Sequence, residues 1–216
     1  MVLMKVELLD TFGNDNMVCN VARVSYRKIA AMYTLEENDK LILFLAKNNH
    51  WSPFAHPKVQ FRLEMPIYVE RQIIKTVVGV DYNSVSGRYV DFSDTYTTID
   101  TWRKQSTSSK QGSGEDLDEK SNAIANFIQD DVVDCAKIAY QKLIELGISK
   151  EQARTILPLN LNTTMIWTGS LYALIRLCNQ RLKPNAQKET RDVVQEMLRQ
   201  VKETNLFTTS LTAYNL

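Results

Sequence analysis

The sequence has few of the residues on which redox and zinc chemistry depend. Its 216 residues include three cysteines, Cys19, Cys135 and Cys178, and two histidines, His50 and His56. The cysteines form no CxxC pair and two histidines are too few for a zinc site, so we expect reduced thiols and no bound metal. No cysteine stands beside a plausible base, which argues against a thiolate nucleophile.

The chain also lacks an excess of positive charge and any long apolar run. Lysine and arginine number 26 against 25 aspartates and glutamates, which leaves a net charge of +1. Nucleic-acid binders that rely on counterion release usually carry a clear basic excess, so this class is disfavoured. No stretch reaches the roughly 18 apolar residues of a membrane span, and the N-terminus lacks the apolar region of a signal peptide. We therefore expect a cytoplasmic protein with neither nucleic-acid nor membrane partners.

What the chain does contain is enough apolar material for one core. Hydrophobic residues make up 44 % and charged residues 24 % of a length that suits a single domain, residues 1–216. In the first half, apolar patterns predict strands at 6–9 and 58–65, the second with strict alternation. They also predict helices at 35–48, with Thr34 and Glu37 at capping-box spacing, and at 67–74 after Pro66.

The second half of the sequence is predominantly helical in pattern. Residues 104–121 hold a single large apolar residue, Leu117, and predict a polar surface loop or lid inside the domain. Helical spacing then runs over 124–146 and stops at Gly147. Ser149 and Gln152 stand at capping-box spacing before a short helix, and two more helices are predicted at 163–180 and 184–203. The fold class is α+β, with a small mostly antiparallel sheet and a helical C-terminal half.

Three segments carry residues suited to an anionic ligand, and each has an ordinary alternative. The run from Asn83 to Tyr89 offers hydroxyls, a glycine and Arg88, which match phosphate oxygens but are equally typical of a polar loop. Arg154 lies in an apolar run, where a guanidinium needs an anionic partner, either a ligand or an internal carboxylate. Arg181 follows an apolar helical run, where it either serves a site or stabilises the helix dipole.

Taken together, several short segments of the sequence resemble those of the flavin-dependent thymidylate synthases. The resemblance runs from residue 22 to 189 in the order and approximate spacing of that family. It is carried by Ala22-Arg23-Val24-Ser25, His50 to His56, Arg71-Gln72, Asn83 to Tyr89, Ala153 to Asn160, Trp167-Thr168 and Arg181 to Glu189.

The resemblance implies an activity and its ligands. The family is a homotetramer whose active sites combine several subunits. It binds FAD, takes a one-carbon unit from methylenetetrahydrofolate, is recharged by NADPH, and converts dUMP into dTMP. Carried over by motif, the dUMP-binding residues are Gln72, Lys75, Ser84, Ser86, Gly87, Arg88, Arg154 and Arg181. Arg181 is the expected catalytic residue, because a cation against the uracil favours the negative charge that activates C5.

The flavin-binding residues depart most from the family pattern. The resemblance places them at His50, Ser52, Lys75, Thr76, Val77, Asn83, Ser170, Tyr172 and Arg176. Lys75-Thr76-Val77 replaces the usual Arg-His-Arg, with one extra residue before Asn83, as is typical of a divergent branch. Ser84 replaces the usual glutamate and Asn185 a frequent histidine. A lysine lacks the fork of a guanidinium, so the flavin geometry cannot simply be copied.

Two other functions are compatible with these residues. One is a related enzyme that makes a different C5 modification of dUMP, such as hydroxymethylation, and product analysis distinguishes it. The other is a non-catalytic nucleotide-binding paralogue that has lost flavin, which the altered triplet favours and the colour of the purified protein tests. A nucleic-acid-binding module is the least favoured, because Arg88, Arg154 and Arg181 lie on separate elements with no basic stripe.

Overall fold

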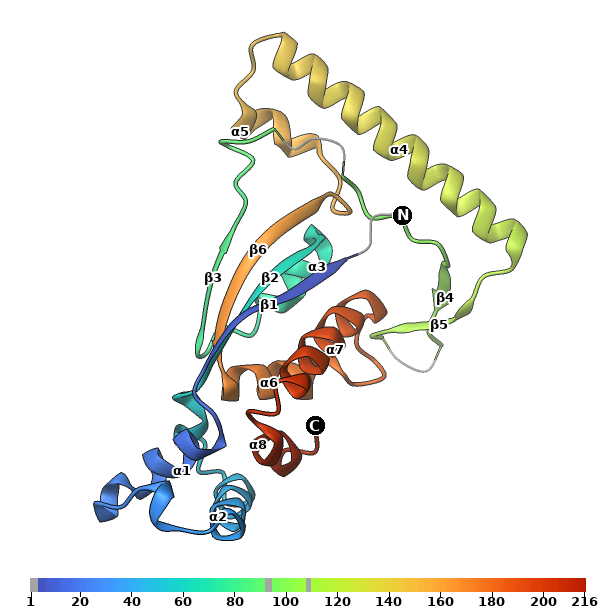
Figure 1. Ribbon diagram of the computed structural model, residues 1–216. Coiled ribbons are helices and arrows are strands. Elements are labelled where there is room, and N and C mark those ends of the chain that lie inside the picture. Colours follow the sequence, from blue (N-terminus) through green and yellow to red (C-terminus); the bar gives the residue numbers. More distant parts are fainter. Residues whose placement is uncertain (1–3, 92–94, 108–109) are drawn as a thin grey trace.

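The structure, a computed structural model, describes residues 4–91, 95–107 and 110–216. A curved sheet forms its centre, with a helical cluster at one end and a long helix standing apart (Figure 1). In chain order the elements are β1 (Lys5–Phe12), α1 (Asp15–Arg23), α2 (Leu35–Lys47), β2 (Lys58–Pro66), α3 (Ile67–Ile73), β3 (Val80–Ser84), β4 (Arg103–Gln105), β5 (Ser113–Asp116), α4 (Glu119–Glu145), α5 (Lys150–Ala153), β6 (Asn162–Ser170), α6 (Leu171–Arg181), α7 (Lys188–Glu203) and α8 (Thr208–Ala213).

The main sheet is antiparallel throughout, in the order β1-β2-β6-β3. On β2 the apolar residues Val59, Phe61, Leu63 and Met65 are at most 1 % exposed, so the alternation in the sequence does mark one buried face. The expected α+β class with a small antiparallel sheet is therefore confirmed.

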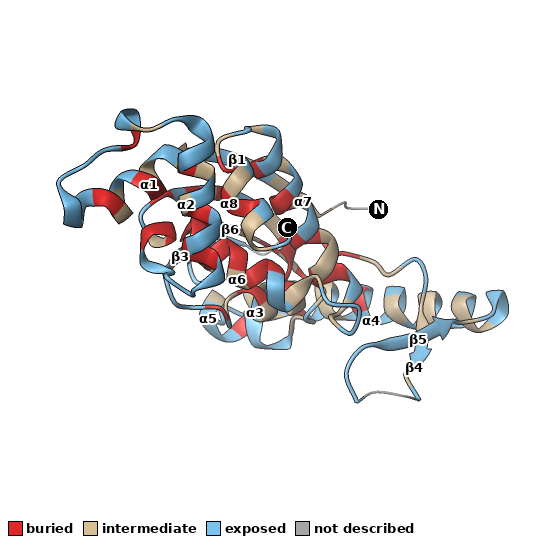
Figure 2. Ribbon diagram, turned by 90° about the horizontal axis from the view of Figure 1, so that it is seen from below, coloured by how far each residue is buried: buried red, intermediate tan, exposed pale blue. Residues whose placement is uncertain are grey.

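The C-terminal helices cover the buried face of the sheet. Leu174, Ile175, Leu177 and Cys178 of α6 are fully buried in the same core cluster as the β2 side chains. Buried residues gather where the sheet meets α6, α7 and α8 (Figure 2). The helix α2 begins at a complete capping box between Thr34 and Glu37, as the sequence predicts.

The helix predicted at 163–180 is wrong over its first half. Residues 162–170 form β6, a central strand between β2 and β3, and only Leu171–Arg181 is helical. Thr163, Met165 and Trp167 alternate with less buried neighbours, which is a strand pattern. Threonine and tryptophan suit a pleated surface, and Thr168-Gly169-Ser170 interrupts the apolar spacing, so the helix begins only after Ser170.

The polar segment 104–121 is more ordered than a loop, and its residues 108–109 lie outside the described part. It contains the end of β4, all of β5 and the start of α4. The two strands pair as a hairpin, and Asp118 caps α4 by accepting a hydrogen bond from Ser121 N at 2.9 Å. The second predicted capping box is also wrong, because Ser149 makes no side-chain cap bond. The elements α1, α8 and β3 were not predicted as such.

The helix α4 is unusual because the described part of the chain leaves its apolar stripe uncovered. Its 27 residues extend about 40 Å beside the sheet (Figure 1). Ile124, Phe127, Ile128 and Val132 are 52–72 % exposed, although their spacing is that of a core-facing stripe. Exposed apolar stripes of this size are typical of surfaces that bind another molecule. Of the helices in the described part, none is long and apolar enough to span a bilayer.

Candidate active site

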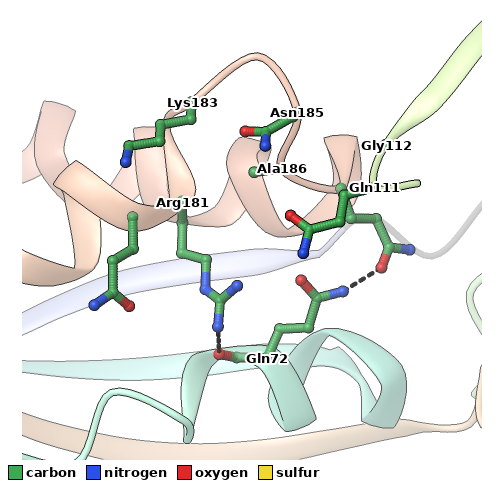
Figure 3. Close-up of a pocket in the computed structure, with 9 residues that line it drawn as sticks. Gln72, Gln111, Gly112, Arg181, Lys183, Asn185 and Ala186 are labelled. Atoms are coloured by element: carbon green, nitrogen blue, oxygen red, sulfur yellow. Dashed lines mark hydrogen bonds between the residues drawn. The ribbon is translucent and has the colours of Figure 1, made fainter. Parts of the chain in front are cut away.

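A polar cavity of about 570 Å³ opens where the C-terminal ends of α3 and α6 meet. Besides Gln72 and Arg181, it is lined by Gln111, Gly112, Gln180, Lys183, Asn185, Ala186 and Gln187 (Figure 3). These residues come from α3, from the hairpin, from the end of α6 and from the connection between α6 and α7. Its volume is in the range typical of small-molecule sites.

Arg181 is held at the mouth of this cavity by the core-facing helix that ends with it. Its Nη2 donates to the main-chain oxygen of Gln72 at 2.6 Å (Figure 3). Its Nε is buried and has no hydrogen-bond partner among the described residues. A buried donor left unsatisfied is costly, and such groups are commonly completed by a ligand or water. Arg181 therefore joins α6 to α3 and keeps donor capacity for a ligand.

The cavity carries positive charge and many carboxamides. Of the described residues that line it, Arg181 and Lys183 are cationic, Gln72, Gln111, Gln180, Asn185 and Gln187 carry amides, and none is acidic. Gln72 Nε2 donates to Gln187 Oε1, and Thr76 Oγ1 donates to Gln180 Oε1 at 3.1 Å. Carboxamides both donate and accept, so the arrangement suits an anionic ligand with a hydrogen-bonding heterocyclic edge.

Next to the cavity, a buried carboxylate is held in its charged form. Arg103 Nη2 lies 2.5 Å from Glu189 Oε1. Burial alone would raise the pKa of Glu189, but hydrogen bonds from the Arg103 side chain, from the backbone amide of Glu189 itself and from the Gln187 side chain outweigh it and leave the pKa below its ordinary value. Burial, followed by the charge of Glu189, raises the pKa of Tyr68 to about 12. The Tyr68 hydroxyl is therefore neutral at physiological pH.

The residues expected at the dUMP phosphate lie elsewhere in the single chain. Ser86, Gly87 and Arg88 form a turn after β3, where Arg88 N donates to Ser86 Oγ at 3.4 Å and the guanidinium lies over Tyr89. Arg154 is exposed, in the turn after α5, so the half-buried guanidinium expected from its apolar surroundings is wrong for the isolated chain. Neither arginine belongs to the cavity lining described above. Ser84 Oγ donates to Glu70 of α3.

Some of the residues expected at the flavin lie at the N-terminus of α6, whereas Thr76 bonds to Gln180 near its other end and Asn83 pairs with Ile166 on β6. Ser170 caps that helix by accepting from Ala173 N at 3.1 Å. Trp51, between His50 and Ser52, stacks on Tyr172 with ring centroids 5.7 Å apart. The strand residue Asn83 is exposed, as are Lys75 and Val77, whereas Thr76 is buried. Arg176 lies one helical turn beyond Tyr172 and is half-buried.

The loop between α3 and β3 passes this helix terminus too closely for a side chain. Gly79 has φ +78°, and a Cβ there would lie 2.8 Å from Ser170 Oγ. Ser170 N also donates to Gly79 O at 2.9 Å. The residues expected at the flavin include two cations, Lys75 and Arg176, and Trp51 beside Ser52 is 50 % exposed. This donor set fits the diphosphate and rings of FAD.

Several residues of the cavity were not predicted as site residues. Gln180, Lys183, Ala186 and Gln187 flank Arg181 in sequence, but nothing in their type distinguishes them from ordinary helix-end residues. Gln111 and Gly112 lie in the segment interpreted as a polar loop. The glycine-rich run around them was an available signal, because Gly112 has φ +85° and packs against Asn185. The hairpin is distant in sequence from Gln72 and Arg181, so its contribution to the cavity is visible only in the three-dimensional structure.

Comparison with known proteins agrees with this fold. Residues 7–205 match the family described as thymidylate synthase complementing protein. The chain is 35 % identical over 199 residues to a flavin-dependent thymidylate synthase of Thermus thermophilus, covering 92 % of this chain and 71 % of that protein. It is 32 % identical over 184 residues to the enzyme of the same name from Kosmotoga olearia, covering 85 % and 79 %.

Solved structures share the fold at lower identity. A UMP/dUMP methylase, PolB from Streptomyces cacaoi bound with 5-Br dUMP, superposes with a TM-score of 0.84 at 23 % identity, over 98 % of this chain and 94 % of that one. With 5-Br UMP the TM-score is 0.86 at 22 % identity, over 100 % and 95 %. The match over residues 7–205 defines the chain's class as that of the thymidylate synthase complementing proteins. The chain belongs to the flavin-dependent thymidylate synthase family.

Proposed function

We propose that the protein converts dUMP into dTMP by reductive methylation at C5. One dUMP, one methylenetetrahydrofolate, one NADPH and one proton give dTMP, tetrahydrofolate and NADP⁺. The proposal is supported by family membership and by the relatives' name. The observation that carries it is the Arg181 guanidinium in a cavity of carboxamides, with no carboxylate among the described residues that line it.

The chain's own residues supply charge and orientation. Uracil C5 becomes nucleophilic only when negative charge builds up on the N3–C4–O4 side of the ring. A guanidinium fixed there by Gln72 O stabilises that charge more than it stabilises the neutral base. When bound, FAD would be held by the Ser52, Lys75–Thr76, Ser170 and Arg176 surroundings, and it supplies the hydride. The polar lining around Arg181 orients the base.

The phosphate residues come from a neighbouring copy in this proposal. Ser86, Arg88 and Arg154 are outside the cavity of their own chain, and α4 presents an uncovered apolar stripe. A homotetramer in which these segments meet the Arg181 cavity of another subunit accounts for both features. Each charge-assisted hydrogen bond contributes about 1.5–3 kcal/mol, so Arg154→Ala should weaken dUMP binding roughly ten- to a hundredfold. The same substitution should weaken the binding of deoxyuridine, which has no phosphate, much less.

The product decides between this function and its alternatives. The purified protein, tested for flavin absorbance, is incubated with dUMP, methylenetetrahydrofolate and NADPH, and the nucleotide is analysed by mass spectrometry. A mass gain of one methyl group supports the proposal. A hydroxymethyl product shows the related C5 modification instead. A colourless protein that takes up no FAD and makes no product, yet binds dUMP, shows the non-catalytic paralogue.

A further inference from the structure

The β4–β5 hairpin contributes one wall of the candidate active site. Gln111 and Gly112 immediately precede β5 and line the cavity together with Gln72 and Arg181. The Gln111 side chain points from the hairpin into the cavity, while Gln72 enters it from α3 (Figure 3). The hairpin thus places a carboxamide beside the cation proposed to face the base.

The wall is formed by close backbone packing at Gly112. This residue has φ +85°, and a Cβ there would lie 3.3 Å from the main-chain oxygen and 3.4 Å from the Cα of Asn185. Both the conformation and the contact favour glycine. The hairpin therefore lies directly on the connection between α6 and α7, the segment that follows Arg181.

A largely buried ion pair joins the hairpin to the first turn of α7. The side chains of Arg103 and Glu189 are 18 % and 12 % exposed, with Nη2 and Oε1 2.5 Å apart. Arg103 Nε also donates to Ser113 Oγ at 2.7 Å, so one guanidinium contacts both hairpin strands and the helix. Removing one member of such a pair leaves an uncompensated charge. The hairpin's other ion pair, Lys104–Glu115, is 3.6 Å long and exposed, and stays within the hairpin.

We propose that Gln111 is a substrate-contacting residue that helps to determine recognition of the uracil ring, and that Arg103 and Glu189 are positioning residues that hold it in place. This inference rests on the proposed function, because it takes dUMP as the ligand of the cavity. The uracil edge presents an acceptor, a donor and a second acceptor at O4, N3–H and O2. A carboxamide can meet such an edge with either of its ends.

Calorimetry with dUMP on the full-length protein tests the role of Gln111. Loss of one neutral hydrogen bond in Gln111→Ala should raise the Kd for dUMP about two- to tenfold. The matched control is Gln105→Ala, which removes an exposed glutamine from β4 of the same hairpin and should change the Kd less than twofold. In the unaltered protein, dUMP should also slow hydrogen exchange at the amides of residues 110–116.

Kinetic measurements distinguish a positioning role of Arg103 from a purely structural one. Arg103→Met should speed hydrogen exchange of the hairpin and raise KM for dUMP about three- to tenfold, with kcat nearly unchanged. Arg103→Lys should recover part of the KM, and Lys104→Met, which breaks the exposed pair, should change neither constant. If dUMP binds the unaltered protein while Gln111→Ala binds it equally well and the hairpin amides stay unprotected, this inference is wrong and the proposed function stands. If the unaltered protein binds no dUMP, both fail.

Discussion

At the scale of single residues, Arg181 shows how a resemblance and a structure support each other. Its position after an apolar helical run was compatible with a dipole-stabilising role at the end of α6. The structure instead directs Nη2 across to Gln72 of α3 and leaves Nε buried without a partner among the described residues. The packing that produces this contact is not encoded in the few residues around Arg181.

We expect Arg181→Ala to slow the chemical step more than it weakens binding. Loss of one preorganised donor costs about 3–4 kcal/mol, or roughly a hundred- to a thousandfold in rate. Arg181→Lys should recover only part of the rate, since lysine lacks the planar, forked guanidinium. Single-turnover oxidation of pre-reduced flavin with saturating dUMP and methylenetetrahydrofolate measures this rate. The control is Arg191→Ala, which removes another arginine that donates to a main-chain carbonyl, at Pro184, without lining the cavity. Equal rates for the two variants would contradict the catalytic role.

Tyr68 gives a prediction about stability and pH. Burial raises its pKa from 10.0 to about 12, and its hydroxyl has no hydrogen-bond partner among the described residues. Because the folded-state pKa exceeds the unfolded one, the neutral hydroxyl's contribution is complete below pH 10. It is lost as the pH rises towards about 12. Over that pH window the melting temperature of Tyr68→Phe should therefore fall less than that of the unaltered protein. The surface variant Tyr26→Phe should behave like the unaltered protein. An unchanged alkaline loss in Tyr68→Phe would refute the assignment.

At the scale of elements, the sequence predicts well where a period is clean and poorly where two periods join. The alternation of β2 and the capping box of α2 are local features, and both are confirmed. The boundary between β6 and α6 falls at Thr168-Gly169-Ser170, and the N-cap serine after this glycine was an available signal that a helix starts there. Pairing of β6 with β2 and β3 decides the strand, and those partners lie far away in sequence.

The loop between α3 and β3 carries the clearest departure from the family pattern and so a prediction of its own. Lys75 is its exposed cation and immediately precedes Thr76, which bonds to Gln180 of α6. Lys75→Ala should weaken FAD binding roughly three- to tenfold, as expected for loss of one partly solvated charge contact. Lys75→Arg should retain the FAD affinity of the unaltered protein. Titration of the flavin-free protein with FAD, followed by absorbance, measures the affinity, and Lys40→Ala on α2 is the control. If FAD binds Lys75→Ala normally while dUMP binds it weakly, Lys75 serves the nucleotide instead.

At the scale of the whole molecule, the isolated chain is incomplete in two respects. The apolar stripe of α4 is exposed, and the arginines expected at the phosphate lie outside the cavity that holds Arg181. The sequence alone does not reveal either feature, because helical spacing predicts a buried face without saying which chain buries it. Both features are explained if the site forms only on assembly, and an experiment with mixed subunits can test this directly.

Two inactive variants should complement each other if each site combines residues of two chains. Arg181→Ala keeps its own Arg88, and Arg88→Ala keeps its own Arg181. In randomly mixed tetramers, about a quarter of the sites would draw Arg181 and Arg88 from intact copies, so about a quarter of the unaltered activity should return. Co-expression with two different affinity tags, followed by sequential purification, yields the mixed tetramers, and tetramers of either variant alone are the baseline. If one chain supplied both arginines, every site would lack one of them. Mixed tetramers would then be no more active than the baseline, and the shared-site proposal would be excluded.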